Sequence, residues 1–263
     1  MTKGEAKILV LGDICGNSGT SAIESQLWGI RKQYGVDMVV ANGENSTADS
    51  VGIDKTSAER LFDSGVDVIT TGNHIWRKSS AHSLLENNPY VIRPANYPSA
   101  CPGSGYCIFD MNSYKVLVMN VMGTVFMESL DSPFTTADKI LQREEGNFDF
   151  AVCDIHAEAT SEKIALARYL DGRVTAVFGT HTHVQTADEK VLPKGTGFIT
   201  DAGMCGPSDS VLGIKSEIII QKFLTKMPAR HEEAVNDVII CGCLFTVSTE
   251  TGKCLSAERI CIS

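Results

Sequence analysis

Five apolar runs, each followed at once by a small cluster of polar side chains, constrain this chain more than any other feature. The runs begin at residues 8, 38, 66, 150 and 174, and stretches with helical periodicity lie between several of them. Continuous apolar runs that alternate with helices are typical of parallel strands covered on both faces. In open α/β sheets, ligands bind beyond the carboxyl ends of the strands. We therefore expect the five polar clusters to converge on one crevice.

The clusters are rich in carboxylate, amide and imidazole groups. In chain order, their members are Asp13, Glu44 with Asn45, Asn73 with His74, His156, and His181 with His183. Carboxylate oxygens suit magnesium, manganese and iron, and imidazole suits zinc, iron and manganese. These side chains therefore indicate a metal site.

A pair of divalent ions fits this set of side chains. Glu44 can bridge two ions, and Asp13 is the other formal anion, so the loaded site keeps a net positive charge that attracts a phosphodiester. Paired ions roughly 3.5–4 Å apart activate a bridging water and clamp the phosphoryl oxygens. His74 is then in a position to protonate the leaving alkoxide.

Taken singly, each cluster has a simpler interpretation. An isolated Asn73 is more often a turn residue, and an isolated His156 is more often a buried, hydrogen-bonded histidine. The pair His181 and His183 is more specific, because alternation on an extended chain puts both rings on one side. The occurrence of all five clusters at equivalent ends of apolar runs favours a binuclear metal site.

Composition limits the class of protein. Hydrophobic residues make up 43% of the 263 residues and charged residues 21%, as in ordinary globular proteins, and we expect one domain over residues 1–263. The net charge of −9 disfavours binding along an extended nucleic acid, because few cations are available to displace counterions, but it allows a small nucleotide. No apolar stretch approaches the length of a membrane span, so no membrane partner is expected.

The cysteines indicate a reducing compartment. They number nine, which is odd, and no signal-peptide pattern precedes them. We therefore expect a cytoplasmic protein whose thiols are reduced and act mostly as small buried apolar groups. Cys241, Cys243 and Cys261 lie in a strand-rich tail and are interpreted in the same way, since the two Cys-x-x-Cys units of a zinc ribbon are absent.

Periodicity gives a coarse order of elements. Strands are expected at residues 8–11, 38–41, 66–70, 106–110, 115–121, 150–155, 174–178, 197–200, 216–223, 238–247 and 254–262. Helices are expected at residues 21–34, 56–64, 79–86 and 162–170. The concentration of strands after residue 190 suggests a second sheet packed on the first.

Longer motifs surround the polar clusters. They are GEN at 43–45, TGNH at 71–74, RPANYP at 93–98, HAEATSEK at 156–163, GTHTHVQT at 179–186, DAGM at 201–204 and GP at 206–207. With these motifs the chain resembles the calcineurin-like metallophosphoesterases, and more closely the YmdB-type bacterial subgroup of 2′,3′-cyclic-nucleotide phosphodiesterases. The resemblance extends from about residue 7 to residue 247.

The resemblance implies a fold, an activity and a set of site residues. The fold is an α/β sandwich of two mixed β-sheets flanked by helices. The activity is hydrolysis of small cyclic nucleotides, such as 2′,3′-cyclic AMP, by metal-activated hydroxide attack with His74 as general acid. One metal ion would be held by Asp13, Glu44, Asn45 and His183, and the second by Glu44, Asn73, His156 and His181. The implied ions are iron first, with manganese or zinc as alternatives. The implied partner is a small nucleotide or phosphodiester, and a homo-oligomer is compatible with the sequence.

Three positions depart from the wider superfamily. Cys15 stands where the pattern Asp-x-His has its histidine, so Asn45 is the expected replacement ligand, and the thiol either binds metal or, as we expect, only packs. Ile75 stands where an acidic residue usually follows Asn-His, so the group that orients His74 must come from elsewhere. Thr124 stands where the subgroup often has a basic residue.

Two further segments near these motifs allow more than one interpretation. Arg93 and Tyr97 either line a substrate pocket or only shape a loop that Pro94 and Pro98 stiffen. The segment 203–206 is interpreted as a turn that closes over the site.

Two other functions remain open at this point. One is a phosphatase or phosphodiesterase of broad specificity that uses the same metal centre. The other is a regulatory nucleotide-binding protein that acts in RNA metabolism. A plain dinucleotide-binding domain fits poorly, since no Gly-x-Gly-x-x-Gly follows the first apolar run.

Overall fold

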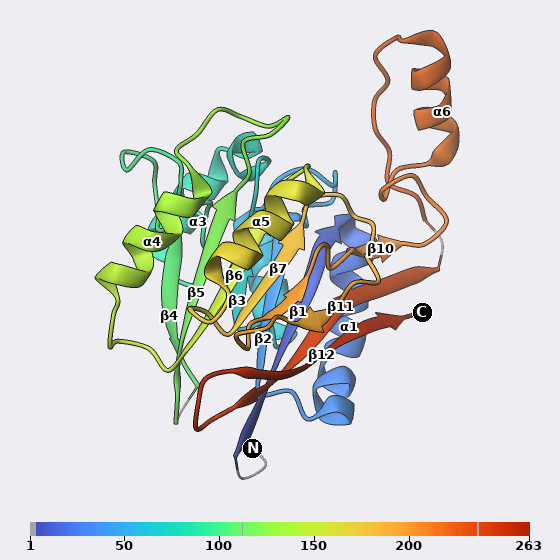
Figure 1. Ribbon diagram of the computed structural model, residues 1–263. Coiled ribbons are helices and arrows are strands. Elements are labelled where there is room, and N and C mark those ends of the chain that lie inside the picture. Colours follow the sequence, from blue (N-terminus) through green and yellow to red (C-terminus); the bar gives the residue numbers. More distant parts are fainter. Residues whose placement is uncertain (1–3, 112, 236) are drawn as a thin grey trace.

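Two six-stranded sheets face each other, and helices cover the outer face of each sheet (Figure 1). The computed structural model that shows this arrangement describes residues 4–111, 113–235 and 237–263. Both sheets contain parallel and antiparallel pairs of strands. The expected sandwich of two mixed sheets flanked by helices is therefore confirmed.

The first sheet places N-terminal and C-terminal strands side by side. Its order is β12-β11-β10-β1-β2-β3, and β11 also pairs along β1. The strands are β1 (Glu5–Cys15), β2 (Met38–Asn45), β3 (Val68–Thr70), β10 (Met204–Pro207), β11 (Val238–Ser248) and β12 (Cys254–Ile262). β10, β1, β2 and β3 run parallel, whereas β11 and β12 are antiparallel to their neighbours.

The second sheet is formed by the middle of the chain, and its order is β4-β5-β6-β7-β9-β8. The strands are β4 (Tyr106–Asp110), β5 (Lys115–Met122), β6 (Phe150–His156), β7 (Ala176–Thr180), β8 (Lys190–Val191) and β9 (Gly197–Ile199). The four inner strands are parallel, and the two edge strands are antiparallel.

Alternating side chains of the strands fill separate cores. In β1, Ile8 and Val10 pack between the two sheets with Val152 and Phe178 of the second sheet. Leu9 and Leu11 of the same strand point to the opposite face, which the helices cover. Both faces of the strand are therefore buried, which explains why its sequence is continuously apolar.

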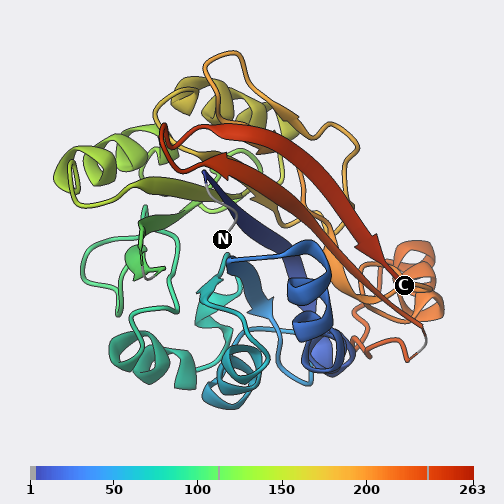
Figure 2. The same cartoon turned by 90° about the horizontal axis from the view of Figure 1, so that it is seen from below.

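The helices divide between the two outer faces, as the view from below shows (Figure 2). Those on the first sheet are α1 (Gly16–Tyr34), α2 (Lys55–Asp63), the 3₁₀ helix η1 (Ile75–Arg77) and α3 (Ser80–Asn87). Those on the second sheet are α4 (Pro133–Arg143) and α5 (Thr160–Leu170). Among the described residues, no helix combines the length and the apolar character needed to cross a membrane.

Four details of the expected topology are wrong. Residues 216–223 form helix α6 (Ser216–Thr225), not a strand, and this helix projects on an arm away from both sheets (Figure 1). Residues 133–143 form α4, a helix that was not expected from the sequence. The tail strands β11 and β12 join the first sheet beside β1 and do not form a second sheet. Residues 204–207 form β10 and pair with β1, so this segment is not a turn over the site.

Candidate metal centre

The polar clusters come together where parallel strands of both sheets end. β1, β2 and β3 bring in residues from the first sheet, and β6 and β7 bring in residues from the second. The residues placed there are Asp13, Glu44, Asn45, Asn73, His74, His156, His181 and His183. The convergence predicted from the sequence thus occurs, but between two facing sheets and not along one open sheet.

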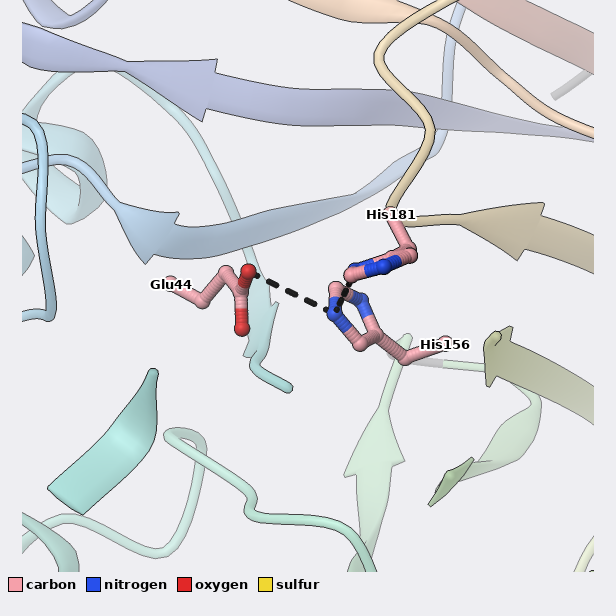
Figure 3. A group of neighbouring side chains, drawn as sticks. All are labelled: Glu44, His156 and His181. Atoms are coloured by element: carbon pink, nitrogen blue, oxygen red, sulfur yellow. Dashed lines mark hydrogen bonds and ion pairs between the residues drawn. The ribbon is translucent and has the colours of Figure 1, made fainter. Parts of the chain in front are cut away.

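Glu44, His156 and His181 form the tightest group. One ligand atom from each residue lies within 4.8 Å of the others, and their side chains point toward one another (Figure 3). His156 Nε2 lies 3.4 Å from Glu44 Oε1, 3.1 Å from His181 Nδ1 and 2.9 Å from Asn73 Oδ1. The four residues expected around the second ion are therefore neighbours in space.

The four residues expected around the first ion are also neighbours, although they lie further apart. His183 Nε2 lies 3.8 Å from Asp13 Oδ1 and 3.3 Å from Asn45 Nδ2. Asn45 Nδ2 in turn lies 3.3 Å from Glu44 Oε1. Glu44 is the residue common to both groups.

A buried oxygen without a partner fits a cation at this place. Asp13 is fully buried, and its Oδ1 accepts no hydrogen bond from the described residues. Leaving a buried acceptor unsatisfied costs about 1–3 kcal/mol. A cation between Asp13 and His183 removes this cost, so the donor set fits a bound metal.

A glycine keeps the space between the two sheets open. A Cβ at Gly72 would lie 2.2 Å from His156 Nε2 and 2.4 Å from Glu44 Oε2. Any other residue at this position would collide with two candidate ligands. The glycine that precedes Asn73 in the sequence is therefore required by the close approach of the two sheets at the site.

Acceptors on β2 orient His74. Its Nδ1 lies 2.8 Å from Asn45 Oδ1 and 3.3 Å from Glu44 Oε1, while its backbone N–H donates to Glu44 Oε2 over 3.0 Å. Nδ1 must carry a proton to face two acceptors, which leaves Nε2 available for a substrate. Asn45 and Glu44 thus perform the orienting role of the acid that Ile75 replaces in this sequence.

The amide of Asn45 presents its oxygen on one side and its nitrogen on the other. Its Oδ1 faces His74, and its Nδ2 faces Glu44 and His183. Binding of a metal through Oδ1 requires the side-chain amide of Asn45 to rotate by about 180°. Glu44 Oε1 then remains as the acceptor for His74 Nδ1.

Burial and nearby imidazoles act in opposite directions on the two carboxylates. Burial alone would raise the pKa of Glu44, but the adjacent rings of His156 and His74 lower this pKa well below its usual range. Burial raises the pKa of Asp13, and the neighbouring histidines only partly offset it. Glu44 is therefore the carboxylate that carries its negative charge most readily before any ion binds.

The two touching imidazoles have very different proton affinities. Burial lowers the pKa of His156, but the carboxylates around it, Glu44 foremost, raise the pKa to about 9. Burial and the adjacent His156 lower the pKa of His181 to about 3. Without an ion, the pair therefore carries one positive charge near neutral pH, on His156, and His181 is neutral.

Thr180 and Asp154 hold the ring of His156 from behind. The Thr180 hydroxyl donates to Asp154 Oδ1 over 2.7 Å, so His156 Nδ1–H donates to Thr180 Oγ1 over 2.9 Å. Nε2 then faces the other candidate ligands. Metal-binding histidines usually have such a partner on their second nitrogen. Sequence reasoning missed Thr180, although it directly precedes His181.

The loop with His181 and His183 is held in a strained conformation. Both residues have positive φ angles, 100° and 64°, which are rare for residues other than glycine. Such strain is found at functional sites and persists only where the surroundings enforce it. The backbone N–H of His181 donates to Asp13 Oδ2 over 2.9 Å, which ties the loop to the first sheet.

A buried ion pair between Lys163 and Asp201 anchors the same loop. Lys163 Nζ lies 2.7 Å from Asp201 Oδ2, and both side chains are buried. Asp201 Oδ2 also accepts from the hydroxyl and the backbone N–H of Thr182. Asp201 Oδ1 accepts from the N–H of Gly203, whose carbonyl accepts from Asp13 N–H. Asp201 therefore connects the histidine loop to the strand end that carries Asp13.

Cys15 lies behind His183 as a thiol. Its Sγ lies 3.4 Å from His183 Nδ1 and donates to the Asp13 carbonyl over 3.4 Å. Burial, together with the nearby Asp13 carboxylate, raises the pKa of the Cys15 thiol well above its usual range. The contacts therefore favour the packing role over that of a thiolate ligand.

Arg93 and Tyr97 shape a loop. The Arg93 guanidinium donates to the carbonyls of Pro102 and Pro94 over 3.0 and 2.9 Å. The Tyr97 hydroxyl donates to Glu128 Oε2 over 2.8 Å. Both side chains are buried, which favours the loop role over a place in a substrate pocket.

The fold and the site together define the class of protein. Two facing mixed sheets with a carboxylate–histidine group at the strand ends are the architecture of a calcineurin-like metallophosphoesterase. A family model described as YmdB-like protein matches residues 9–260. The chain belongs to this family.

Individual relatives are similar over nearly their whole length. The chain is 39% identical over 257 residues to the 2′,3′-cyclic-nucleotide 2′-phosphodiesterase of Bacillus subtilis (strain 168), covering 98% of this chain and 97% of the relative. The crystal structure of a hypothetical protein from Thermus thermophilus matches with a TM-score of 0.90 at 39% identity, covering 97% of this chain and 98% of that one. That of a novel phosphatase from Mycoplasma pneumoniae matches with a TM-score of 0.91 at 34% identity, covering 98% and 93%.

Proposed function

We propose that this protein hydrolyses small cyclic nucleotides of the 2′,3′-cyclic type at a centre of two metal ions. It is a hydrolase acting on phosphoric diester bonds, in keeping with its family. The observation that carries the proposal is the buried Asp13 Oδ1, unsatisfied by the described residues, beside the cluster of Glu44, His156 and His181. The similarity to the 2′,3′-cyclic-nucleotide 2′-phosphodiesterase of Bacillus subtilis supports the choice of substrate.

Each ion has a set of residues that would hold it. The first set is Asp13, Glu44, Asn45 and His183, and the second is Glu44, Asn73, His156 and His181. Mixed oxygen and imidazole donors of this kind suit iron, manganese or zinc, and we propose iron first. When bound, such ions polarise the phosphoryl oxygens and activate water for attack on phosphorus.

His74 is the proposed proton donor to the leaving ribose oxygen. Its ring is about 30% exposed, so it reaches the open side of the site where a substrate enters. Glu44 Oε1 accepts from Nδ1 and holds the ring, and Nε2 then gives its proton to the departing oxygen. Cleavage of one ester bond of the five-membered ring leaves a nucleoside monophosphate.

A second candidate is a phosphatase of broader specificity. The Mycoplasma pneumoniae neighbour, described as a novel phosphatase, favours this candidate, and the same site residues would serve it. The two functions differ in whether the site prefers a cyclic diester or a monoester.

A substrate panel distinguishes the two candidates. The metal-loaded protein is assayed with nucleoside 2′,3′-cyclic phosphates, 3′,5′-cyclic phosphates and nucleoside monophosphates, and kcat/KM is compared. We expect the 2′,3′-cyclic phosphates to have the highest kcat/KM. Faster turnover of monoesters contradicts the first candidate and supports the second. The Asp13→Ala variant serves as the control for contaminating phosphatases, because it should lose metal and activity together.

A further inference from the structure

Two cysteine side chains face each other across the strand pair β11 and β12. Cys241 and Cys261 are direct register partners in this antiparallel pair. Their sulfur atoms lie 3.6 Å apart. Directly opposed residues of an antiparallel pair have Cα atoms about 4.5–5.5 Å apart, which lies within the range that a disulfide bridges.

The two thiols differ in exposure. Cys261 is exposed, whereas Cys241 is 3% exposed. Burial, with the nearby thiols of Cys205 and Cys261 adding to it, raises the pKa of the Cys241 thiol. A dissolved reagent therefore reaches Cys261 first, whereas Cys241 is shielded from solvent. The sequence-based expectation that both are core thiols is wrong for Cys261.

The strand pair is held in register at the next position. Gln185 Nε2 donates to the carbonyls of Gly242 and Ile260, over 2.9 and 2.8 Å. Gly242 and Ile260 are themselves register partners, adjacent to the cysteine pair. One side chain thus links both strands beside the thiols and limits the movement that would separate the sulfur atoms.

We propose that Cys241 and Cys261 are a modification site that forms a reversible cross-strand disulfide with a low-molecular-weight disulfide as oxidant. The thiolate of Cys261 attacks one sulfur of the oxidant, whose disulfide bond breaks and releases one thiolate. Cys241 then gives its proton to this released thiolate, and its sulfur attacks Cys261 Sγ and expels the second thiolate, which takes a proton from water. Two protein thiols are oxidised, and the oxidant is reduced to two small thiols.

The cysteine pair is linked through Gln185 to the loop that carries His181 and His183. Gln185 follows His183 by two positions, so the side chain that holds the strand pair belongs to the loop with the candidate ligands. The proposal nevertheless rests on the two thiols alone and does not depend on the proposed substrate. It is tested without any assay of turnover.

The test is oxidation of the metal-loaded protein with oxidised glutathione, followed by intact-mass measurement and peptide mapping under non-reducing conditions. We expect the wild-type protein to lose two of its nine thiols and to yield a peptide pair linked through Cys241 and Cys261. Dithiothreitol should reverse the change. Cys101→Ser, which removes a partly exposed thiol elsewhere, is the matched control and should form the same link.

Two variants distinguish the attack of Cys261 on the oxidant from the attack of Cys241 on Cys261. Cys261→Ser should form no link, and Cys241→Ser should instead retain one glutathione on Cys261, because the resolving thiol is missing. Circular dichroism checks the fold, and Cys241→Ala replaces Cys241→Ser if the hydroxyl disturbs the core. Absence of the linked peptide in the wild type overturns the proposal, and so does a Cys241 variant that retains no adduct.

Discussion

The proposed role of His74 as general acid requires one ring nitrogen to be held and the other to be free. Its Nδ1 is fixed by Asn45 and Glu44, so its other nitrogen is free for proton transfer. We expect His74→Ala to lower kcat by about 10²–10⁴-fold, the usual contribution of a general acid, while metal content stays unchanged. Steady-state kinetics and elemental analysis of the same preparation measure both quantities.

A second histidine provides the control for this prediction. His82 is exposed on α3 and packs edge-on against Trp76, with ring centroids 5.7 Å apart. His82→Ala should leave kcat and metal content unchanged. A His74→Ala protein with wild-type kcat contradicts the role assigned to His74.

The proton on His156 makes metal binding depend on pH. In the metal-free protein its pKa is about 9, above the usual 6.5, so the ring is protonated below pH 9. A metal that binds through Nε2 must displace this proton, so its affinity should rise with pH and level off near pH 9. Titration calorimetry with Mn²⁺ in buffers of different ionisation enthalpy measures the affinity and the protons released. An affinity that stays constant from pH 6 to pH 9 contradicts this account.

At the residue scale, the sequence predicted the candidate ligands but not the groups that hold them. Asp13, Glu44 and His156 stand at the ends of apolar runs, and this position is visible in the chain order. Asp201 and Thr180 act through contacts between distant segments, and such contacts have no local pattern. For the same reason the orienting role of Asn45 became visible only in the structure.

At the scale of elements, the loop between β7 and β8 depends on a buried ion pair. Lys163→Met leaves Asp201 buried without its cation, so the anchor of Thr182 is weakened. We expect metal affinity to fall about 10–100-fold, as when a group that orients ligands is removed. The free energy of unfolding should fall by about 3–5 kcal/mol, because an unpaired buried charge remains. Metal titration and denaturant unfolding measure the two effects.

A partly buried ion pair away from the site provides the control for Lys163→Met. It distinguishes an effect on metal binding from a general loss of stability. Arg31 Nη1 lies 2.9 Å from Asp67 Oδ2, with the side chains 15% and 19% exposed. Arg31→Met should lower the free energy of unfolding but leave metal affinity unchanged. If both variants weaken metal binding equally, Lys163 has only a general structural role.

Helices α1 and α6 should respond very differently to the same substitution. Leu27 of α1 is fully buried in the core under the first sheet, and Leu27→Ala should lower the free energy of unfolding by about 2–5 kcal/mol. Leu224 of α6 is 76% exposed, and Leu224→Ala should change this energy by less than about 0.5 kcal/mol. Chemical denaturation compares the two, and equal losses contradict the projecting position of α6.

The error at α6 has a physical cause. The run Ile218-Ile219-Ile220 is β-branched and favours a strand when judged alone. The segment lies on an arm where none of the described strands runs beside it, so a helix satisfies its backbone locally (Figure 1). Helix α4 was missed although its apolar residues recur at helical spacing: Ala137 and Ile140 are buried, and Phe134 and Leu141 pack beside them.

At the scale of the molecule, the sandwich was predictable and its strand assignment was not. Apolar runs and the family resemblance predicted two mixed sheets with helices outside them. The pairing of β11 with both β1 and β12 depends on contacts across the whole chain, which no local pattern encodes. The single domain over residues 1–263 stays a prediction, supported by the placement of β1 between strands from both ends of the chain.

The central claim is that two metal ions share Glu44 where the two sheets meet. Diffraction from crystals of the metal-loaded protein, recorded at the absorption edges of iron, manganese and zinc, tests ligands, number and identity together. We expect two anomalous peaks on either side of the Glu44 carboxylate, one beside Asp13 and His183 and the other beside His156 and His181. A single peak, or peaks bound by other residues, contradicts the binuclear centre proposed for this protein.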